Sequence, residues 1–242
     1  NFFKNDIYNA LSGNFTVNQI IKKIKKYKKK IIKVKNEFNF LNYFASQKRE
    51  KSRAKIIAIT GSAGKTSLKN LIKDQLDIFG KTFCSPKSFN NYLGVPLSLS
   101  ELNTDHQFAV FEVGMSKAGE IHSLSKLIKP HIGIITNIGE AHIENFKNLN
   151  GIAKAKGEII NNIQKNGTLI LNRDDNYFNY LKKRAKLKNL RVLSFGISKK
   201  SDVYPISFKQ NNKEKKITLK VCDQIIKIKI KNLNIYNILA TL

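Results

Sequence analysis

The chain has 242 residues, of which 41% are hydrophobic, and it carries a formal net charge of +27 at pH 7. This length suits one large domain or two modest ones with a real core. No apolar run is long enough to cross a membrane and the N-terminus has no signal-peptide pattern, so we expect no membrane span.

Lysine supplies nearly all of the positive charge, because arginine occurs only at positions 49, 53, 173, 184 and 191. Specific nucleic-acid contacts favour arginine, and the densest lysine run, 22–35, follows a helical pattern of apolar residues and predicts a solvated helix face. We therefore expect no nucleic-acid partner, although attraction to anionic substrates fits the charge. The two cysteines, Cys84 and Cys222, lack metal or disulfide spacing, which favours a reducing compartment, the cytoplasm.

Residues 1–53 are expected to be part of a small N-terminal α/β domain. A basic helix, a short strand at 31–34 and a second helical segment through Phe38 and Phe44 predict it. The polar stretch 46–53 is expected to be a linker. Since the chain starts at Asn1 and stops inside an apolar run, we expect it to be a piece of a longer protein.

Strand and helix patterns alternate from Lys55 onward, which predicts a mostly parallel sheet flanked by helices on both faces. The strands are expected at 55–59, 107–113, 132–138, 167–172 and 190–195, and the helices at 66–79, 118–128, 151–164 and 175–186. An antiparallel pair, 217–221 and 225–230, and a final helix from Leu233 follow. Binding sites in such sheets lie at the carboxyl ends of the strands.

A glycine-rich loop follows the first of these strands directly. Residues 60–67 read Thr-Gly-Ser-Ala-Gly-Lys-Thr-Ser and lead into a helical pattern, an order that builds a phosphate cradle for ATP or GTP. Backbone N–H groups would face the anion, Lys65 would add a positive charge, and Thr66 or Ser67 could bind Mg²⁺. Ile59 departs from the strict pattern, which has Gly or Ala there, so a chance glycine turn is the alternative.

Other candidate residues follow neighbouring strands. Glu112 ends the strand 107–113, where a carboxylate commonly holds Mg²⁺, although it could be a surface residue. His142 follows the strand 132–138, yet a lone histidine is more often structural. Lys156 opens a helix, where a charged side chain is usually solvated.

Two polar loops allow more than one interpretation. The segment 88–96, which contains Asn90 and Asn91, is either a turn or an amide-rich loop for a polar ligand. The segment 172–175 is either a turn with a helix cap or a contact to the nucleotide.

Together these residues resemble the ATP-dependent Mur ligases of peptidoglycan synthesis. The resemblance extends over about residues 31–242 and rests on five motifs in order. They are 60–67, Asn90-Asn91-x-x-Gly94-x-Pro96, Glu112-Val113-Gly114 with Gly119-Glu120-Ile121, Asn137 to Phe146 with its Ala-His-x-Glu-x-Phe run, and Ala155-Lys156-Gly157-Glu158. Within the family, the second and fourth motifs are most similar to the member that adds D-alanyl-D-alanine to UDP-N-acetylmuramoyl-tripeptide.

The resemblance implies a three-domain enzyme that works as a monomer. Residues 1–53 would be the end of a UDP-sugar-binding domain with its linker, 54–242 the P-loop-type central ATP-binding domain, and the C-terminal ligase domain would be absent. The segment 233–240 is similar to the family's adenine-binding element, in which Asn237 keeps the amide and Leu233 replaces a histidine. By itself the chain would bind nucleotide without turnover.

The reaction implied is transfer of the ATP γ-phosphoryl group to a substrate carboxylate, followed by attack of the amine of D-alanyl-D-alanine on the acyl phosphate. Lys65, His142 and Lys156 would be catalytic, and Asn90 and Asn91 would contact the muramoyl-peptide. Mg²⁺ would be held by Thr66, Glu112, His142 and Lys156 as a carbamate. ATP would contact Gly61, Ser62, Ala63, Gly64, Lys65, Thr66, Ser67 and Asn237.

Three alternatives remain at this point. A different ligase on the same fold, such as a folylpolyglutamate synthase, would take another acceptor, for example glutamate. A GTPase switch would need an Asn-Lys-x-Asp signature, which the chain lacks. A basic nucleic-acid-binding module would bind strands with a steep salt dependence.

Overall fold

The computed structural model describes residues 34–210, 215–230 and 235–241. The expected basic helix, most of the short strand at 31–34, and Leu233 lie outside these residues. The chain divides into two units between Phe40 and Leu41, and the description below concerns the second unit.

One mixed sheet of nine strands runs through the described part of the chain, in the order β2-β3-β1-β4-β5-β6-β7-β8-β9. Strands β1 to β7 pair in parallel, and β7, β8 and β9 pair antiparallel. The strands are β1 Lys55–Thr60, β2 Thr82–Cys84, β3 Phe108–Glu112, β4 Ile132–Ile135, β5 Thr168–Asn172, β6 Arg191–Phe195, β7 Val203–Gln210, β8 Lys215–Val221 and β9 Gln224–Ile230.

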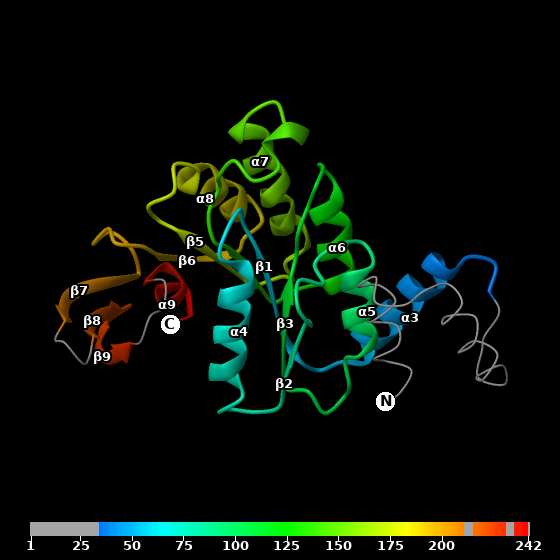
Figure 1. Cartoon of the computed structure of the whole chain (residues 1–242), viewed down its shortest axis with the longest axis horizontal. Coiled ribbons are helices and arrows are strands. Elements are labelled where there is room, and N and C mark those ends of the chain that lie inside the picture. The colour runs from blue at the N-terminus through cyan, green and yellow to red at the C-terminus, as the bar shows by residue number, and fades with distance from the viewer. Residues whose placement is uncertain (1–33, 211–214, 231–234, 242) are drawn as a thin grey trace. The chain divides into compact units, whose positions relative to one another are not determined.

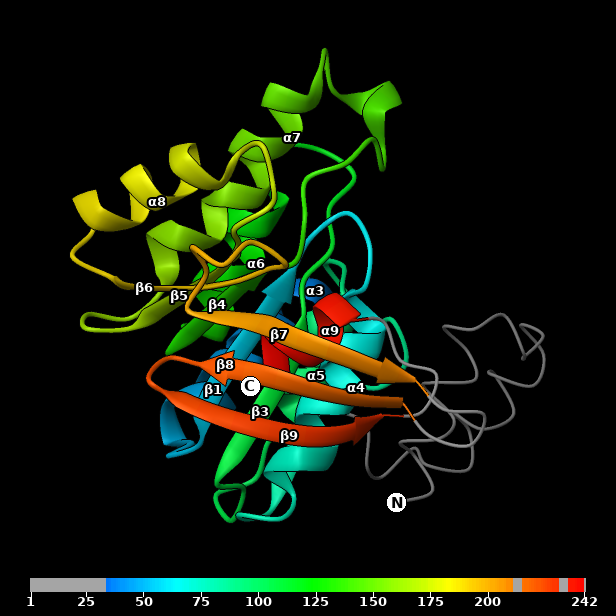
Figure 2. The ribbon, with the colours of Figure 1, turned by 90° about the vertical axis from the view of Figure 1, so that its left-hand side faces the viewer.

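Helices cover both faces of the sheet, which gives two apolar cores. They are α3 Glu37–Lys51, α4 Lys65–Leu76, α5 Gly94–Ser100, α6 Glu120–Ile128, α7 Leu149–Lys156, α8 Phe178–Leu187 and α9 Ile235–Thr241, with short 3₁₀ helices η2 Ile143–Asn145 and η3 Gly157–Asn162. One core joins the sheet to α5, α6, α7, η3 and α8. The other joins it to α4 and α9 and continues under the antiparallel strands. Figure 1 shows α4 on one side of β1 and β3 and α6 on the other, and in Figure 2 β7–β9 pass in front of α9.

The buried strands explain why the parallel sheet was predictable. Five of the six residues of β1 are buried and apolar or small, as expected for a strand covered on both faces. The predicted α/β class, the five parallel strands, the antiparallel pair and the final helix are all confirmed. Among the helices that the structure describes, none is both long and apolar enough to cross a bilayer.

Several local predictions were wrong. β4 ends at Ile135 rather than at residue 138, and the predicted helix 151–164 is α7 followed by the 3₁₀ helix η3. The elements β2, α5 and β7 were not predicted, because β2 is only three residues long and α5 begins inside a glycine- and proline-containing loop.

The segment expected as a linker is largely helical. Residues 46–51 form the end of α3, where Ala45 is fully buried. Arg49 is also buried, and its guanidinium donates hydrogen bonds of 2.6 and 2.8 Å to the carbonyls of Ile128 and Lys129 at the end of α6. A cation at a helix C-terminus is favourable, so Arg49 caps α6 from within the expected linker.

Candidate active site

The glycine-rich loop lies between β1 and α4, at the carboxyl edge of the sheet. Gly61 has φ +147° and Gly64, the N-cap of α4, has φ +82°, conformations that other residues rarely adopt. A Cβ on Gly61 would lie 1.9 Å from Thr136 Oγ1. The loop therefore needs glycine at both positions, and it ends on a helix N-terminus, which favours anions.

Residues that follow β4 brace this loop from the side. Thr136 Oγ1 donates to the Ala63 carbonyl (2.6 Å), and Asn137 Oδ1 accepts from the Ala63 N–H (2.9 Å). Ser62 Oγ donates to the Gly139 carbonyl (2.9 Å) and accepts from the Gly139 N–H (2.8 Å). Residues 136, 137 and 139 thus form hydrogen bonds with the loop and do not continue the strand. This explains why β4 ends early.

Lys65 folds back over the loop that precedes it. Its ammonium donates to the Gly61 carbonyl at 2.8 Å. Burial lowers the pKa of Lys65, and the nearby charge of Glu112 partly opposes this effect. The Lys65 ammonium therefore lies against the backbone of the loop, beside the N-terminus of α4.

Thr66 and Glu112 form the pair that was expected to bind Mg²⁺. Thr66 Oγ1 donates to Glu112 Oε2 at 2.7 Å, and Asn90 Nδ2 donates to Glu112 Oε1 at 2.7 Å. The Glu112 side chain is buried, whereas Ser67 is exposed, so Thr66 is the hydroxyl placed beside the carboxylate. Hydroxyl and carboxylate oxygens are ligands that Mg²⁺ prefers, and the donor chemistry of this pair fits that ion.

The two asparagines of the second motif have different contacts. Asn90 orients Glu112 as described, and Asn91 Oδ1 accepts from the N–H groups of Leu93 and Gly94 (3.2 and 2.9 Å) at the start of α5. Asn91 therefore closes a turn that begins a helix. The contact of these asparagines with the muramoyl-peptide stays a prediction.

Lys156 lies at the end of α7 with only 3% of its surface exposed. Its burial, and then the charge of Lys65, lower its pKa from 10.5 to about 7. The expectation that a charged residue here would be solvated is therefore wrong for Lys156, whereas Lys154 is exposed. The lowered pKa increases the fraction of the Lys156 amine that is neutral and nucleophilic near pH 7.

His142 occupies a different environment. It precedes the short helix η2 with φ +62°, its side chain is half exposed, and its Nδ1 lies 3.8 Å from Glu144 Oε1. Over residues 34–210, 215–230 and 235–241, no three His, Cys, Asp or Glu side chains gather as a metal cluster. The metal and catalytic roles of His142 stay predictions.

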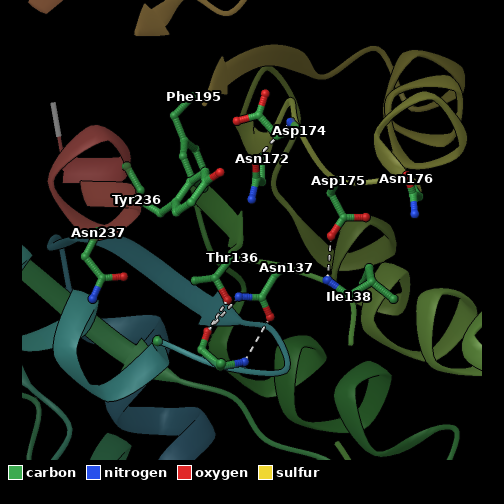
Figure 3. A pocket seen from close by; sticks show the side chains of 13 residues that line it. Thr136, Asn137, Ile138, Asn172, Asp174, Asp175, Asn176, Phe195, Tyr236 and Asn237 are labelled. Atoms are coloured by element: carbon green, nitrogen blue, oxygen red, sulfur yellow. Dashed lines mark hydrogen bonds between the residues drawn. The ribbon is translucent and has the colours of Figure 1, made fainter. Parts of the chain in front are cut away.

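A cavity of about 380 Å³ opens beside the loop, and it includes Asn237. In Figure 3 Tyr236 and Asn237 enter it from α9, opposite Thr136 and Asn137. The remaining wall is formed by residues of the loop, by residues at or just after the ends of β4, β5 and β6, and by one further residue of α9: Ala63, Gly64, Ile138, Asn172, Asp174, Asp175, Asn176, Phe195 and Ala240. Its position next to the helix N-terminus suits a base and ribose attached to phosphates held by the loop.

The structure confirms the turn with a helix cap at segment 172–175, whereas its contact to the nucleotide stays a prediction. Asp175 accepts from the N–H groups of Ile138 (2.6 Å) and Tyr177 (2.8 Å), so it joins the loop after β4 to the start of α8. Asp174 lines the cavity and accepts a hydrogen bond from Tyr236, whose pKa is raised first by burial and then by this carboxylate. Sequence reasoning gave no role to Thr136, nor to Asn137 of the fourth motif or Tyr236 of the segment 233–240; for Thr136 and Asn137, a polar position directly after a buried strand was the available signal.

Comparison with known proteins identifies the family. The family model of the Mur ligase middle domain matches residues 59–242. The UDP-N-acetylmuramoyl-tripeptide–D-alanyl-D-alanine ligase of Rickettsia prowazekii is 45% identical over 185 residues, which are 75% of this chain and 41% of that protein. The chain thus spans about two fifths of the length of this curated relative.

Solved structures give the same result for the fold. A crystal structure of MurF from Acinetobacter baumannii superposes with a TM-score of 0.80 at 31% identity, over 86% of this chain and 46% of that one. A MurF ligase from Thermotoga maritima in complex with ADP has a TM-score of 0.78 at 24% identity, over 87% and 49% of the two chains.

Proposed function

Because this chain belongs to the Mur ligase family, we propose that it is the ATP-binding part of a ligase that joins D-alanyl-D-alanine to UDP-N-acetylmuramoyl-tripeptide. The observation that carries the proposal is the phosphate loop with Lys65 and the adjoining Thr66–Glu112 pair. The relative from Rickettsia prowazekii bears the name of this activity. In this proposal residues 54–242 are the ATP-binding domain and 1–53 are the end of a UDP-sugar-binding domain.

The proposed reaction has two steps. A carboxylate oxygen of the tripeptide forms a bond to the γ-phosphorus of ATP while the bond to ADP breaks, which gives an acyl phosphate. The amine of D-alanyl-D-alanine then attacks the acyl carbon, loses a proton and displaces phosphate. The first step brings two anions together, so it requires concentrated positive charge.

The loop residues would supply that charge and position the triphosphate. The N–H groups at the start of α4 and the Lys65 ammonium would hold the β- and γ-phosphates, and Asn237 with the cavity beside it would take the adenosine. Thr66 and Glu112 would hold Mg²⁺, which when bound supplies further positive charge beside the phosphates.

Lys156 is proposed to carry a carbamate, formed when its neutral amine bonds to the carbon of CO₂ and releases a proton. Its lowered pKa supports this role, since only the neutral amine reacts. The carbamate oxygens would be hard ligands for a second Mg²⁺. His142, from the preceding motif, is proposed as a further ligand of this ion. Carbon NMR in ¹³C-bicarbonate should show a carbamate signal that Lys156→Met removes; the same spectrum in both proteins would reject it.

Partners and location follow from the same proposal. The substrates are the UDP-linked tripeptide and D-alanyl-D-alanine, the protein acts as a monomer, and its nucleotide substrate places it in the cytoplasm. Sedimentation of the chain tests whether it is a monomer, because a dimer would exclude a monomeric enzyme.

Calorimetric titration with ATP and with GTP tests nucleotide binding. We expect the chain to take up ATP in preference to GTP, and Lys65→Ala to weaken ATP binding about 10–100-fold, as for loss of a charge-assisted contact. Lys73→Ala is the matched control, because Lys73 lies on the same helix, partly exposed and paired with Asp77. No ATP uptake, or full uptake by Lys65→Ala, would defeat the proposal.

The acceptor requires a separate measurement. A panel of D-alanyl-D-alanine, glutamate and a diamino acid, assayed as ADP release by a protein spanning the full length of these relatives, would identify it. Release that depends on D-alanyl-D-alanine supports the proposal, and release that depends on another acceptor replaces it with a different ligase.

A further inference from the structure

Lys69 is a lysine in the protein interior that the chemistry above does not use. It lies on α4, one turn after the Lys65 of the phosphate loop, and only 1% of its surface is exposed. Its ammonium donates to the carbonyls of Ser85 (2.7 Å) and Lys87 (2.5 Å). Burying an ammonium is costly even when it is hydrogen bonded, and an apolar side chain would usually cost less.

The carbonyls that Lys69 binds belong to the segment 85–90, which links β2 to the asparagine motif. Lys87 has φ +45°, a left-handed conformation that turns the chain within this segment. Ser85 is buried, and its Oγ accepts the backbone N–H of Glu112 at 3.2 Å. The segment therefore contacts α4 through Lys69 and β3 through Ser85.

The same segment ends at the residue that orients the Glu112 carboxylate. Asn90 donates from its side chain to Glu112 Oε1 (2.7 Å), and its carbonyl accepts the Gly114 N–H (2.8 Å). The other carboxylate oxygen, Oε2, accepts from Thr66, which is on α4 three residues before Lys69. A closed set of contacts thus runs from α4 through Lys69, the segment 85–90 and Glu112 back to α4.

We propose that Lys69 is a positioning residue for the Mg²⁺ site: by holding the segment 85–90 against α4, it fixes Asn90 and thereby the orientation of the Glu112 carboxylate. The inference rests on the proposed binding of Mg²⁺ and ATP. Without the ammonium, the carbonyls of Ser85 and Lys87 lose this donor, the segment shifts, and Glu112 turns away from Thr66. The loop amides and Lys65 are unaffected, so binding of metal-free nucleotide should persist.

The test is calorimetric titration of the chain with ATP under two conditions. The first titration contains EDTA, which removes metal ions, and the second contains Mg²⁺ in place of EDTA. The readout is the ratio of the two affinities. Loss of an orienting partner commonly lowers metal affinity about 10–100-fold, so Lys69→Met should lower this ratio by up to that factor with metal-free affinity unchanged. Lys73→Met, one turn further along α4, is the matched control and should keep the wild-type ratio.

Asn90→Ala provides the second arm, because it removes the last contact of the proposed chain. It should lower the ratio as Lys69→Met does, and the double variant should lose little more than either single variant, since both act on the same carboxylate. If Lys69→Met does not fold, Lys69→Gln, which keeps an amide donor at a shorter reach, replaces it and should also lower the ratio.

Three other results would overturn the inference. A lower thermal midpoint with a wild-type ratio would mean that Lys69 only stabilises the fold, and a drop in metal-free affinity would mean that it acts on the phosphates directly. If the losses in the affinity ratio add up in the double variant, Lys69 and Asn90 act independently. Failure of the proposed function gives a different result, because the wild-type chain would then show no ATP binding or no Mg²⁺ effect.

Discussion

Thr66 and Glu112 lie 46 positions apart in the chain, yet the hydroxyl of one donates to the carboxylate of the other at 2.7 Å. The parallel register of β1 and β3 brings them together, because it pairs Ile59 with Glu112 and so sets the carboxylate level with the start of the phosphate loop. The helix that begins at Lys65 then turns Thr66 back toward it. Two local patterns thus meet at one candidate metal position.

Substitution Glu112→Gln tests this pair. The amide keeps the shape of the side chain but removes the charge, and one of the two donors, Thr66 or Asn90, would then face an N–H group. We expect the gain in ATP affinity on adding Mg²⁺ to fall about 10–100-fold, measured by calorimetry. Glu50→Gln, at an exposed position outside the five motifs, should keep the wild-type gain, and an equal gain in both variants would contradict the assignment.

Substitution of two glycines by alanine separates backbone strain from steric contact. Gly61 and Gly119 both have positive φ, so alanine is strained at each by about 1–3 kcal/mol. A Cβ at Gly61 would also lie 1.9 Å from Thr136 Oγ1, whereas nothing lies within 4 Å of one at Gly119. We expect Gly61→Ala to lose about 1–3 kcal/mol more in urea unfolding than Gly119→Ala, and equal losses would refute the close packing of the loop.

The lowered pKa of Lys156 predicts a pH-dependent stability. Below pH 7 Lys156 is protonated in both the folded and the unfolded chain, and its burial destabilises the fold fully. Between about pH 7 and 10.5 the unfolded chain binds more protons, so this residue makes the free energy of unfolding rise with pH, by at most about 5 kcal/mol.

Urea unfolding at several pH values in CO₂-free buffer measures this contribution. Lys156→Met should remove its part of the rise between pH 7 and 10, whereas Lys154→Met, an exposed lysine on the same helix, should keep the wild-type slope. A wild-type slope in Lys156→Met would show that the amine titrates normally in the folded chain.

Glu158, the acidic residue of the fifth motif, contacts the start of α6. Its carboxylate accepts the N–H groups of Gly119 (2.8 Å) and His122 (3.0 Å) at the start of α6. Glu158→Ala should therefore destabilise the fold by about 1–2 kcal/mol in urea unfolding, as loss of a helix cap does. Glu50→Ala removes an exposed ion pair with Lys129 and should cost less than about 1 kcal/mol, so equal losses would exclude the capping role.

The arrangement of the sheet could be read from the chain because its signals are local. Buried apolar strands, the glycine loop and the following helix occupy consecutive residues, and each is recognisable within one short window. The sequence did not predict β2, because three residues carry too weak a pattern, or α5, because it begins inside a glycine- and proline-containing loop. Polarity misled us at 46–53, where Arg49 is buried by its contacts with α6.

By itself the sequence determined the alternating α/β order, the phosphate loop and the motif residues, since these depend on neighbours along the chain. Only the tertiary structure decided that Thr66 rather than Ser67 meets Glu112, that Asn90 orients this carboxylate while Asn91 starts a helix, and that Lys156 is buried. Those outcomes depend on strand register and on the burial of groups far apart in sequence. Burial and nearby charge, which exist only after folding, are also what change the pKa of a lysine.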